Sequence, residues 1–170
     1  MTYEIHPDVC AGTVARDEAL PCPIIQMNQV HDVKVAVVDR VGIPQDELDG
    51  CDAILTDLPG VAIGVRTADC IPVLLYDPVK KAAAAIHSGW KGTVSKIISK
   101  TVAQMRTAYS SQPSDLLAFI GPGICMDCFQ VGEEVALKFK EAGFDIDSLW
   151  AFRGPKTGNG MDTCRVRSEE

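Results

Sequence analysis

The chain has 170 residues, of which 46% are hydrophobic and 23% are charged, and this composition excludes an intrinsically disordered protein. Its formal net charge of -7, with basic residues scattered along the sequence, argues against non-specific nucleic-acid binding. No run approaches the roughly 18 apolar residues of a membrane span, and the first residues do not resemble a secretion signal, so we expect a cytoplasmic protein.

Short apolar runs bounded by Gly, Pro and Asp predict a β-sheet in the first two-thirds of the chain. They cover residues 24–29, 33–38, 61–65, 71–75, 82–86 and 116–120. Runs that are apolar throughout are typical of strands covered on both faces. Val33, Val35 and Val37 instead alternate with other residues, which predicts a strand exposed on one side. We therefore expect a sheet that is mixed in environment and in direction.

Two helices are predicted beyond residue 90. From 93 to 108, apolar residues recur at intervals of three and four and form one stripe that should pack on the sheet. The stripe consists of Val94, Ile97, Ile98, Thr101 and Met105. From 131 to 142 a second apolar stripe predicts another helix, with Glu133 and Glu134 in its first turn, lysines near its end and Gly143 as its terminator.

These elements predict an α+β fold, in which helices cover a layered, mixed β-sheet core, in a single domain at residues 1–152. Residues 153–170 combine a Gly-rich loop composition with alternating charges and have no apolar period. We expect them to form a poorly ordered tail.

The chain holds three histidines, and two of them lie in unusual short segments, as does one of the seven cysteines. His31 ends Asn-Gln-Val-His, Cys70 ends Thr-Ala-Asp-Cys, and His87 begins His-Ser-Gly-Trp-Lys-Gly. All three fall at predicted strand ends, where distant segments can meet in one crevice. If they converge, they form a site of two nitrogens and one sulfur with an open fourth position, as in catalytic zinc centres. Taken singly, each is more often a hydrogen-bonding or packing group.

The residues after His87 add to this pattern. Gly89 and Gly92 leave the backbone bare, as happens where a ligand approaches a loop. Trp90 is suited to stacking on a planar ligand, and Lys91 to meeting an anion near the start of the next helix. The alternative, that Trp90 is a core anchor and Lys91 a solvated charge, is equally open.

The cysteines do not predict a disulfide framework, because their number is odd and their spacing wide. Cys125 and Cys128 have the Cys-x-x-Cys spacing, but a four-cysteine zinc site needs a second such pair. A thioredoxin-type motif needs a strand-to-helix setting early in the fold. We interpret these two residues as incidental thiols in a Gly-Pro loop.

Four segments together resemble the laccase-domain family, also called the multicopper polyphenol oxidase or bacterial purine nucleoside phosphorylase proteins. They are Asn28-Gln29-Val30-His31, Arg66-Thr67-Ala68-Asp69-Cys70-Ile71-Pro72-Val73-Leu74, His87-Ser88-Gly89-Trp90-Lys91-Gly92, and residues 120–124 with 129–132. The resemblance implies zinc bound by His31, Cys70 and His87, with copper as the second candidate metal. It also implies a purine-nucleoside site above the metal.

The resemblance further implies an enzyme that phosphorolyses adenosine, inosine, guanosine and S-methyl-5'-thioadenosine and that deaminates adenosine. Its partners would be a purine nucleoside and phosphate, with no nucleic acid and no membrane, and a homo-oligomer is left open. Candidate catalytic residues are Asp69, Lys91 and Arg66, and candidate substrate-binding residues are Asn28, Gln29 and Trp90.

Three other functions use the same residues. Three histidines are too few for a multicopper cluster, so polyphenol oxidation would depend on a single copper in place of zinc. A metal-free hydrolase would use Cys70 activated by His87. A nucleotide-sensing or structural zinc domain would have no turnover.

The chain departs from the family's pattern at both ends and at one position inside a motif. Relatives usually have a longer region before Asn28 and a different carboxy-terminal segment, so we expect some substrate-binding groups to be absent or to come from another subunit. Lys91 stands where arginine is usual, which removes a two-pronged contact to an anion.

Overall fold

The computed structural model describes residues 1–15, 18–20, 22–125, 128–146, 150–152 and 164–166. The chain divides into two compact units, Met1–Gly123 and Ile124–Glu170. The predicted α+β class with a mixed sheet is confirmed. Among the described residues, no helix combines the length and the apolar character needed to cross a bilayer.

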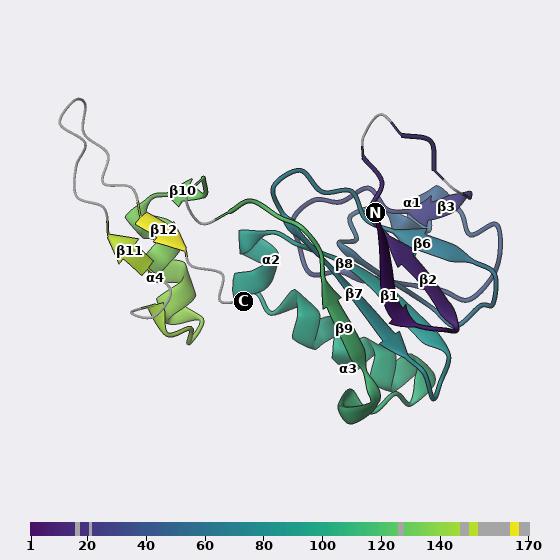
Figure 1. Cartoon of the computed structure of the whole chain (residues 1–170). Helices are drawn as coiled ribbons and strands as arrows, with labels where there is room; N and C mark the ends of the chain where they lie inside the picture. Colours follow the sequence, from purple (N-terminus) through teal and green to yellow (C-terminus); the bar gives the residue numbers. More distant parts are fainter. Residues whose placement is uncertain (16–17, 21, 126–127, 147–149, 153–163, 167–170) are drawn as a thin grey trace. The chain divides into compact units, whose positions relative to one another are not determined.

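A five-stranded mixed sheet forms the centre of the first unit (Figure 1). In spatial order it consists of β4 (Val35–Val38), β5 (Ala53–Thr56), β8 (Ala82–Ser88), β7 (Ile71–Asp77) and β9 (Leu117–Ile120). The β4 and β5 strands are parallel, and every other neighbouring pair is antiparallel. The direction of the sheet is therefore mixed, as predicted.

Smaller elements surround this sheet. They are an antiparallel hairpin of β1 (Thr2–His6) and β2 (Val9–Gly12), a parallel pair of β3 (Ile24–Gln26) and β6 (Ala62–Gly64), the one-turn helix α1 (Gln45–Leu48), and the 3-10 turn η1 (Pro113–Asp115). Each of the six apolar runs contains a strand. The hairpin and β5 were not predicted. The apolar part of β5 is only three residues long, between Asp52 and a threonine, which is too short to stand out.

The single helix predicted at 93–108 is wrong, because two helices occupy this region. They are α2 (Trp90–Val94) and α3 (Ile97–Tyr109). Lys96, between them, has a φ of +61°, a left-handed conformation that a continuous helix does not accommodate. The α3 helix packs on β8, β4 and β5 and buries Ile97, Thr101 and Met105, so the predicted contact with the sheet is confirmed.

Two apolar clusters form the core of the first unit. One joins α3 to the sheet through residues such as Leu55, Ile86 and Met105, and the other includes Met27, Val38 and Ile54. The β4 strand contributes to both clusters, because its valines at 35 and 37 pack against the first while Ala36 and Val38 belong to the second. The prediction that this strand is exposed on one side is therefore wrong.

The second unit contains helix α4 (Glu133–Glu141) and a three-stranded antiparallel sheet. The strands, in spatial order, are β10 (Gln130–Val131), β12 (Cys164–Val166) and β11 (Trp150–Phe152). The α4 helix begins two residues later than predicted, because residue 131 belongs to a strand. It ends as predicted, before Gly143, whose φ is +80°.

The predicted division into residues 1–152 and a tail at 153–170 stays a prediction. Residues 153–163 and 167–170 lie outside the described part of the chain, and the three residues between them form β12.

Candidate metal centre

The three predicted metal ligands converge in the first unit. One ligand atom from each of His31, Cys70 and His87 lies within 4.8 Å of the other two. The sheet brings two of them together, because β7 and β8 are paired and His87 lies opposite Pro72, two residues after Cys70. His31 comes from the loop between β3 and β4. The side chains range from buried at His87, through half-buried at Cys70, to exposed at His31, so the site opens toward solvent.

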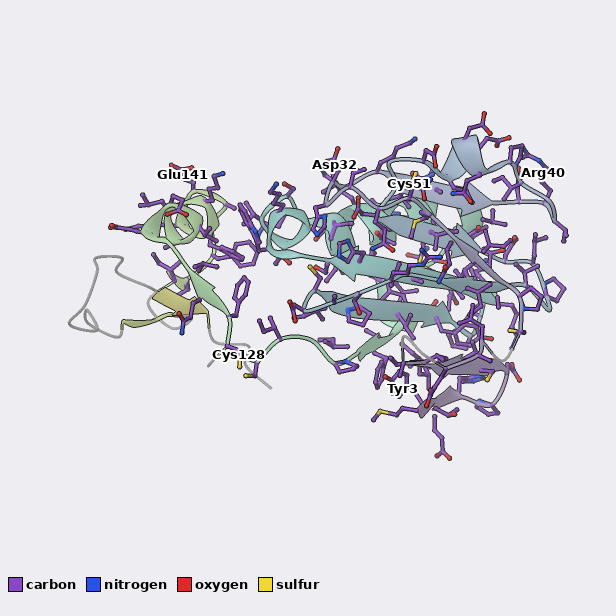
Figure 2. All side chains as sticks on the ribbon, turned by 90° about the horizontal axis from the view of Figure 1, so that it is seen from above. Tyr3, Asp32, Arg40, Cys51, Cys128 and Glu141 are labelled. Carbon is purple, nitrogen blue, oxygen red and sulfur yellow. The ribbon has the colours of Figure 1, made fainter. Side chains whose placement is uncertain are left out.

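Asp52, directly before β5, holds the loop that carries His31. Its carboxylate accepts hydrogen bonds from the backbone amides of Val30, His31 and Asp32, at 3.1, 2.9 and 2.9 Å. Asp32 is labelled in Figure 2. These bonds stabilise a loop in which His31 has a φ of +62°, an uncommon conformation for a residue with a side chain. The carboxylate thus fixes the backbone from which the His31 imidazole extends.

The same carboxylate orients His87. The Nδ1 atom of His87 lies 2.7 Å from Oδ1 of Asp52, and the backbone amide of His87 donates to the Asp52 carbonyl at 2.8 Å. Both side chains are buried, with 0% of Asp52 and 3% of His87 exposed. When Nδ1 carries the proton and donates to the carboxylate, Nε2 is left as the metal-binding nitrogen.

Asp52 is charged in this setting. Burial works to raise the pKa of its carboxyl, but hydrogen bonds from the Asp32 amide, from His87 and from the other two amides outweigh burial and lower that pKa. A buried, ionised carboxylate behind a histidine is a common arrangement in metal sites, because it fixes the tautomer and raises the basicity of the ligand.

The Cys70 thiol has the opposite character. Burial, followed by the charges of Asp69 and Asp52, raises the pKa of this thiol above its usual range. Both effects disfavour the thiolate, which is the form that binds metal. A metal cation beside the sulfur has the opposite effect and favours the thiolate.

Gly89 leaves the space that the ligands occupy. A Cβ atom at this position would lie 3.0 Å from Sγ of Cys70 and 3.2 Å from Cδ2 of His31. Gly92 has a different role, since a Cβ there would lie 3.3 Å from Cγ2 of Ile97 and would disturb the packing of α2 on α3. Packing of the ligands thus explains the glycine at position 89, and packing between helices explains the glycine at position 92.

Comparison of the sequence with models of protein families identifies the family of this chain. The family model described as multi-copper polyphenol oxidoreductase laccase matches residues 11–165. The chain belongs to this laccase family.

Relatives in the laccase family have names that point to nucleoside chemistry. Adenosine deaminase RL5, from an unknown prokaryotic organism, is 39% identical over 149 residues, which are 84% of this chain and 56% of the relative. A purine nucleoside phosphorylase of Bacteroides thetaiotaomicron is 43% identical over 114 residues, which are 67% of this chain and 42% of the relative.

A solved structure shares the fold. The crystal structure of the hypothetical protein YfiH from Bacillus licheniformis matches with a TM-score of 0.73 at 28% identity, over 85% of this chain and 54% of that chain. The chain therefore spans about half the length of the relatives it matches.

Two residues predicted to bind substrate, Gln29 and Asn28, form hydrogen bonds within the protein. The Gln29 amide donates to the carbonyl of Arg66 and accepts from its backbone amide, both at 2.8 Å. The Asn28 amide donates to the carboxylate of Asp49 at 2.5 Å. Gln29 thus joins the loop before His31 to the segment before Cys70.

The remaining candidates lie on exposed or half-buried surface. Lys91 is exposed, and its Nζ atom lies 5.8 Å from the ring centroid of half-buried Trp90, a cation-π distance. Arg66 is exposed, and its Nε atom donates to the side chain of Gln26 at 2.9 Å. Asp69 is exposed and has a φ of +77° beside Cys70.

Asp52 is the residue that sequence reasoning missed. The sequence around Asp52 shows only a charged residue directly before a short apolar run. This pattern is common where strands start, so it does not indicate a functional residue. Only the fold brings it to His31 and His87, which are 21 and 35 residues away in sequence.

Proposed function

We propose that the chain forms the metal-binding core of a zinc-dependent purine nucleoside phosphorylase that also deaminates adenosine. The observation that carries this proposal is the convergence of His31, Cys70 and His87, with Asp52 behind two of them. The names of the relatives support the substrate class. Because the chain spans about half the length of these relatives, the activity is proposed for the assembled site, including any groups from beyond this chain.

The donor set fits zinc. Two imidazoles and one thiolate are ligands that zinc commonly takes, and three protein ligands leave one position for a reacting group. The oriented His87 and the space left by Gly89 are what a preformed site requires. When bound, zinc would supply a Lewis acid that lowers the pKa of water and stabilises negative charge.

The chain's own residues would then bind and orient the substrates. Trp90 would stack on a purine, since its half-buried side chain lies at the start of α2, three residues after the buried ligand His87. The exposed cations Lys91 and Arg66 would bind phosphate, and Asp69 would accept a proton. Asn28 would contact the ribose only by giving up its bond to Asp49, and we assign Gln29 to positioning the two ligand segments.

Two reactions share these groups. In phosphorolysis, a phosphate oxygen forms a bond to C1' of the ribose while the bond from C1' to the purine nitrogen breaks, and the purine leaves with a proton. In deamination, water adds at C6 of adenine and ammonia leaves. Both develop negative charge on oxygen or nitrogen, which the cations stabilise.

Copper-dependent polyphenol oxidation is the second candidate, and the description of the family favours it. The affinity of copper for nitrogen and sulfur ligands exceeds that of zinc, so a single copper in the same site is chemically sound. Three histidines remain too few for a multicopper cluster within this chain. Oxidase activity in zinc-loaded protein free of copper would contradict this assignment of the oxidase to the metal site.

A metal-free hydrolase with Cys70 as nucleophile is less favoured by the geometry. The order of Cys70, His87 and Asp52 resembles a nucleophile, base and orienting acid. That chemistry needs one imidazole, however, whereas the site brings a second, from His31, within the same 4.8 Å. Labelling of Cys70 by an electrophilic substrate analogue in metal-free, active protein would favour the hydrolase.

The test of the proposed function is a product assay on zinc-loaded protein. Adenosine is incubated with and without phosphate, and adenine and inosine are separated by chromatography. We expect adenine only with phosphate, inosine in both conditions, and loss of both products in Cys70→Ala. The matched control is Cys10→Ala, an exposed cysteine on the β1–β2 hairpin, which should retain activity. Activity unchanged in Cys70→Ala would overturn the proposal.

A further inference from the structure

Two neighbouring cysteines, Cys125 and Cys128, lie outside the metal centre. The sulfur atoms of Cys125 and Cys128 are 3.2 Å apart, and both residues are exposed. Figure 2 labels Cys128, with sulfur in yellow. Their spacing in sequence alone suggested two incidental thiols, but in the structure the two sulfurs are in contact.

The backbone holds this pair in place. The amides of Cys128 and Phe129 both donate to the carbonyl of Cys125 at 3.0 Å, and the amide of Gln130 donates to the carbonyl of Cys128 at the same distance. Cys128 lies two residues before the start of β10. These hydrogen bonds hold the backbones of the two cysteines close together.

A metal ion explains this pair less well than oxidation does. Zinc takes four ligands, and two thiolates supply only half of them. Within the described part of the chain, the one cluster of three or more such ligand groups is that of His31, Cys70 and His87. A disulfide needs no further ligand, since its sulfur atoms lie about 2.05 Å apart and the pair can reach this distance by side-chain rotation.

We propose that Cys125 and Cys128 are a reversible redox dithiol, oxidised by a small-molecule disulfide. The thiolate of one cysteine attacks a sulfur of the oxidant and releases one thiol, leaving a mixed disulfide. The second cysteine, as thiolate, attacks the protein sulfur of that mixed disulfide and releases the second thiol. Overall, two protein thiols lose two protons and two electrons, and the oxidant is reduced to two thiols.

The second step separates this pair from the other exposed thiols. A cysteine already in contact with the mixed disulfide reacts within the molecule, at a high effective concentration. Cys10 and Cys22 are also exposed, but neither is in sulfur contact with another cysteine of the described residues, so glutathione bound there would be displaced by a second thiol molecule. Oxidation of the pair would also close a covalent ring just before β10 and slow amide exchange at residues 128–130.

The test uses the full chain in buffers that contain oxidised and reduced glutathione at a series of ratios. Remaining thiols are alkylated, and peptides are mapped by mass spectrometry. We expect the Cys125–Cys128 disulfide to form at a low ratio of oxidised to reduced glutathione. This ratio should be at least about tenfold lower than the ratio at which Cys10 and Cys22 become glutathionylated. Separate glutathione adducts on Cys125 and Cys128, or modification of Cys10 first, would overturn the proposal.

Variants separate the steps. Cys125→Ser should accumulate a mixed disulfide at Cys128, and Cys128→Ser should do the same at Cys125, whereas the control Cys10→Ser should behave as the unaltered chain. If either serine variant fails to fold, the mapping of the unaltered chain still decides the outcome. A second zinc ion per chain that protects both thiols from oxidation would also overturn the proposal.

Discussion

At the scale of single residues, the candidate metal centre depends on one carboxylate. Asp52 accepts bonds from three consecutive amides and from His87, so it orders two ligands that come from different segments. The same buried carboxylate therefore couples the loop of His31 to the strand of His87. Loss of the negative charge of Asp52 should therefore weaken metal binding more than it lowers the stability of the fold.

Asp52→Asn should lower zinc affinity by about 10- to 100-fold, the range observed for residues that orient metal ligands. The measurement is competition with a chromogenic chelator. The control is Asp77→Asn, another carboxyl that is 0% exposed and that lies at the opposite end of β7 from Cys70. Equal zinc affinity in the Asp52 variant and the unaltered chain would refute the positioning role.

Gly89→Ala should reduce zinc affinity more than tenfold, because the added methyl group would lie 3.0 Å from the Cys70 sulfur. Gly42→Ala is the control. Its φ is +78° with open space around a Cβ, so it should lower the free energy of unfolding by about 1 kcal/mol and leave zinc affinity unchanged. Tight zinc binding by the Gly89 variant would show that the ligands do not occupy this space.

The residues of the site differ in how far sequence predicts them. His31, Cys70 and His87 could be predicted because rare residue types occur in distinctive short segments. Asp52 could not, because aspartates are common and its role arises only from tertiary contacts. The amides of Asn28 and Gln29 were predicted to face substrate, but hydrogen bonds to Asp49 and to the backbone of residue 66 use them inside the protein.

At the scale of elements, the break between α2 and α3 shows that local backbone geometry can interrupt an element without a change in the apolar pattern. The apolar period of 93–108 crosses the break at Lys96, because a left-handed residue changes the helix axis without changing the sequence pattern. The β5 strand was missed although it is buried along its whole length, because its apolar run is too short to be distinctive.

Ser110 ends α3 with a φ of +59°, where glycine is the preferred residue. Ser110→Gly should raise the free energy of unfolding by up to about 1 kcal/mol, measured in urea. The same replacement two residues earlier, Ala108→Gly, lies inside the helix and should lower it by about 1 kcal/mol. Changes of the same sign in the two variants would contradict the assigned end of the helix.

Asp77 stabilises the turn between β7 and β8. Its carboxylate accepts bonds from the amides of Val79 and Lys80 at 2.8 and 2.9 Å. Burial works to raise the pKa of this carboxyl, but hydrogen bonds outweigh burial and lower the pKa below its usual range. Because the folded-state pKa is the lower one, the stabilisation is present above about pH 4 and is lost as the pH falls through the folded-state value.

Asp77→Asn should therefore be less stable than the unaltered chain at pH 7, by about 1 kcal/mol, and the difference should shrink at pH 3. Urea unfolding at the two pH values measures both quantities. A difference that stays constant or grows on acidification would contradict the direction of the pKa shift.

At the scale of the whole molecule, the fold class and the mixed sheet followed from the sequence, because apolar runs of strand length are a strong signal. The arrangement of the strands did not follow, since the order β4-β5-β8-β7-β9 depends on pairings between distant segments. The chain spans about half the length of its named relatives, and we infer that this half carries the metal centre.

The metal content per chain decides whether this half carries the metal centre. Protein equilibrated with zinc and passed through a desalting column is measured by plasma mass spectrometry. We predict one zinc ion per chain in the unaltered protein and in Cys10→Ala, and loss of that zinc in Cys70→Ala and His87→Ala. Stoichiometric zinc retained in both ligand variants, or none bound by the unaltered chain, would contradict the metal centre.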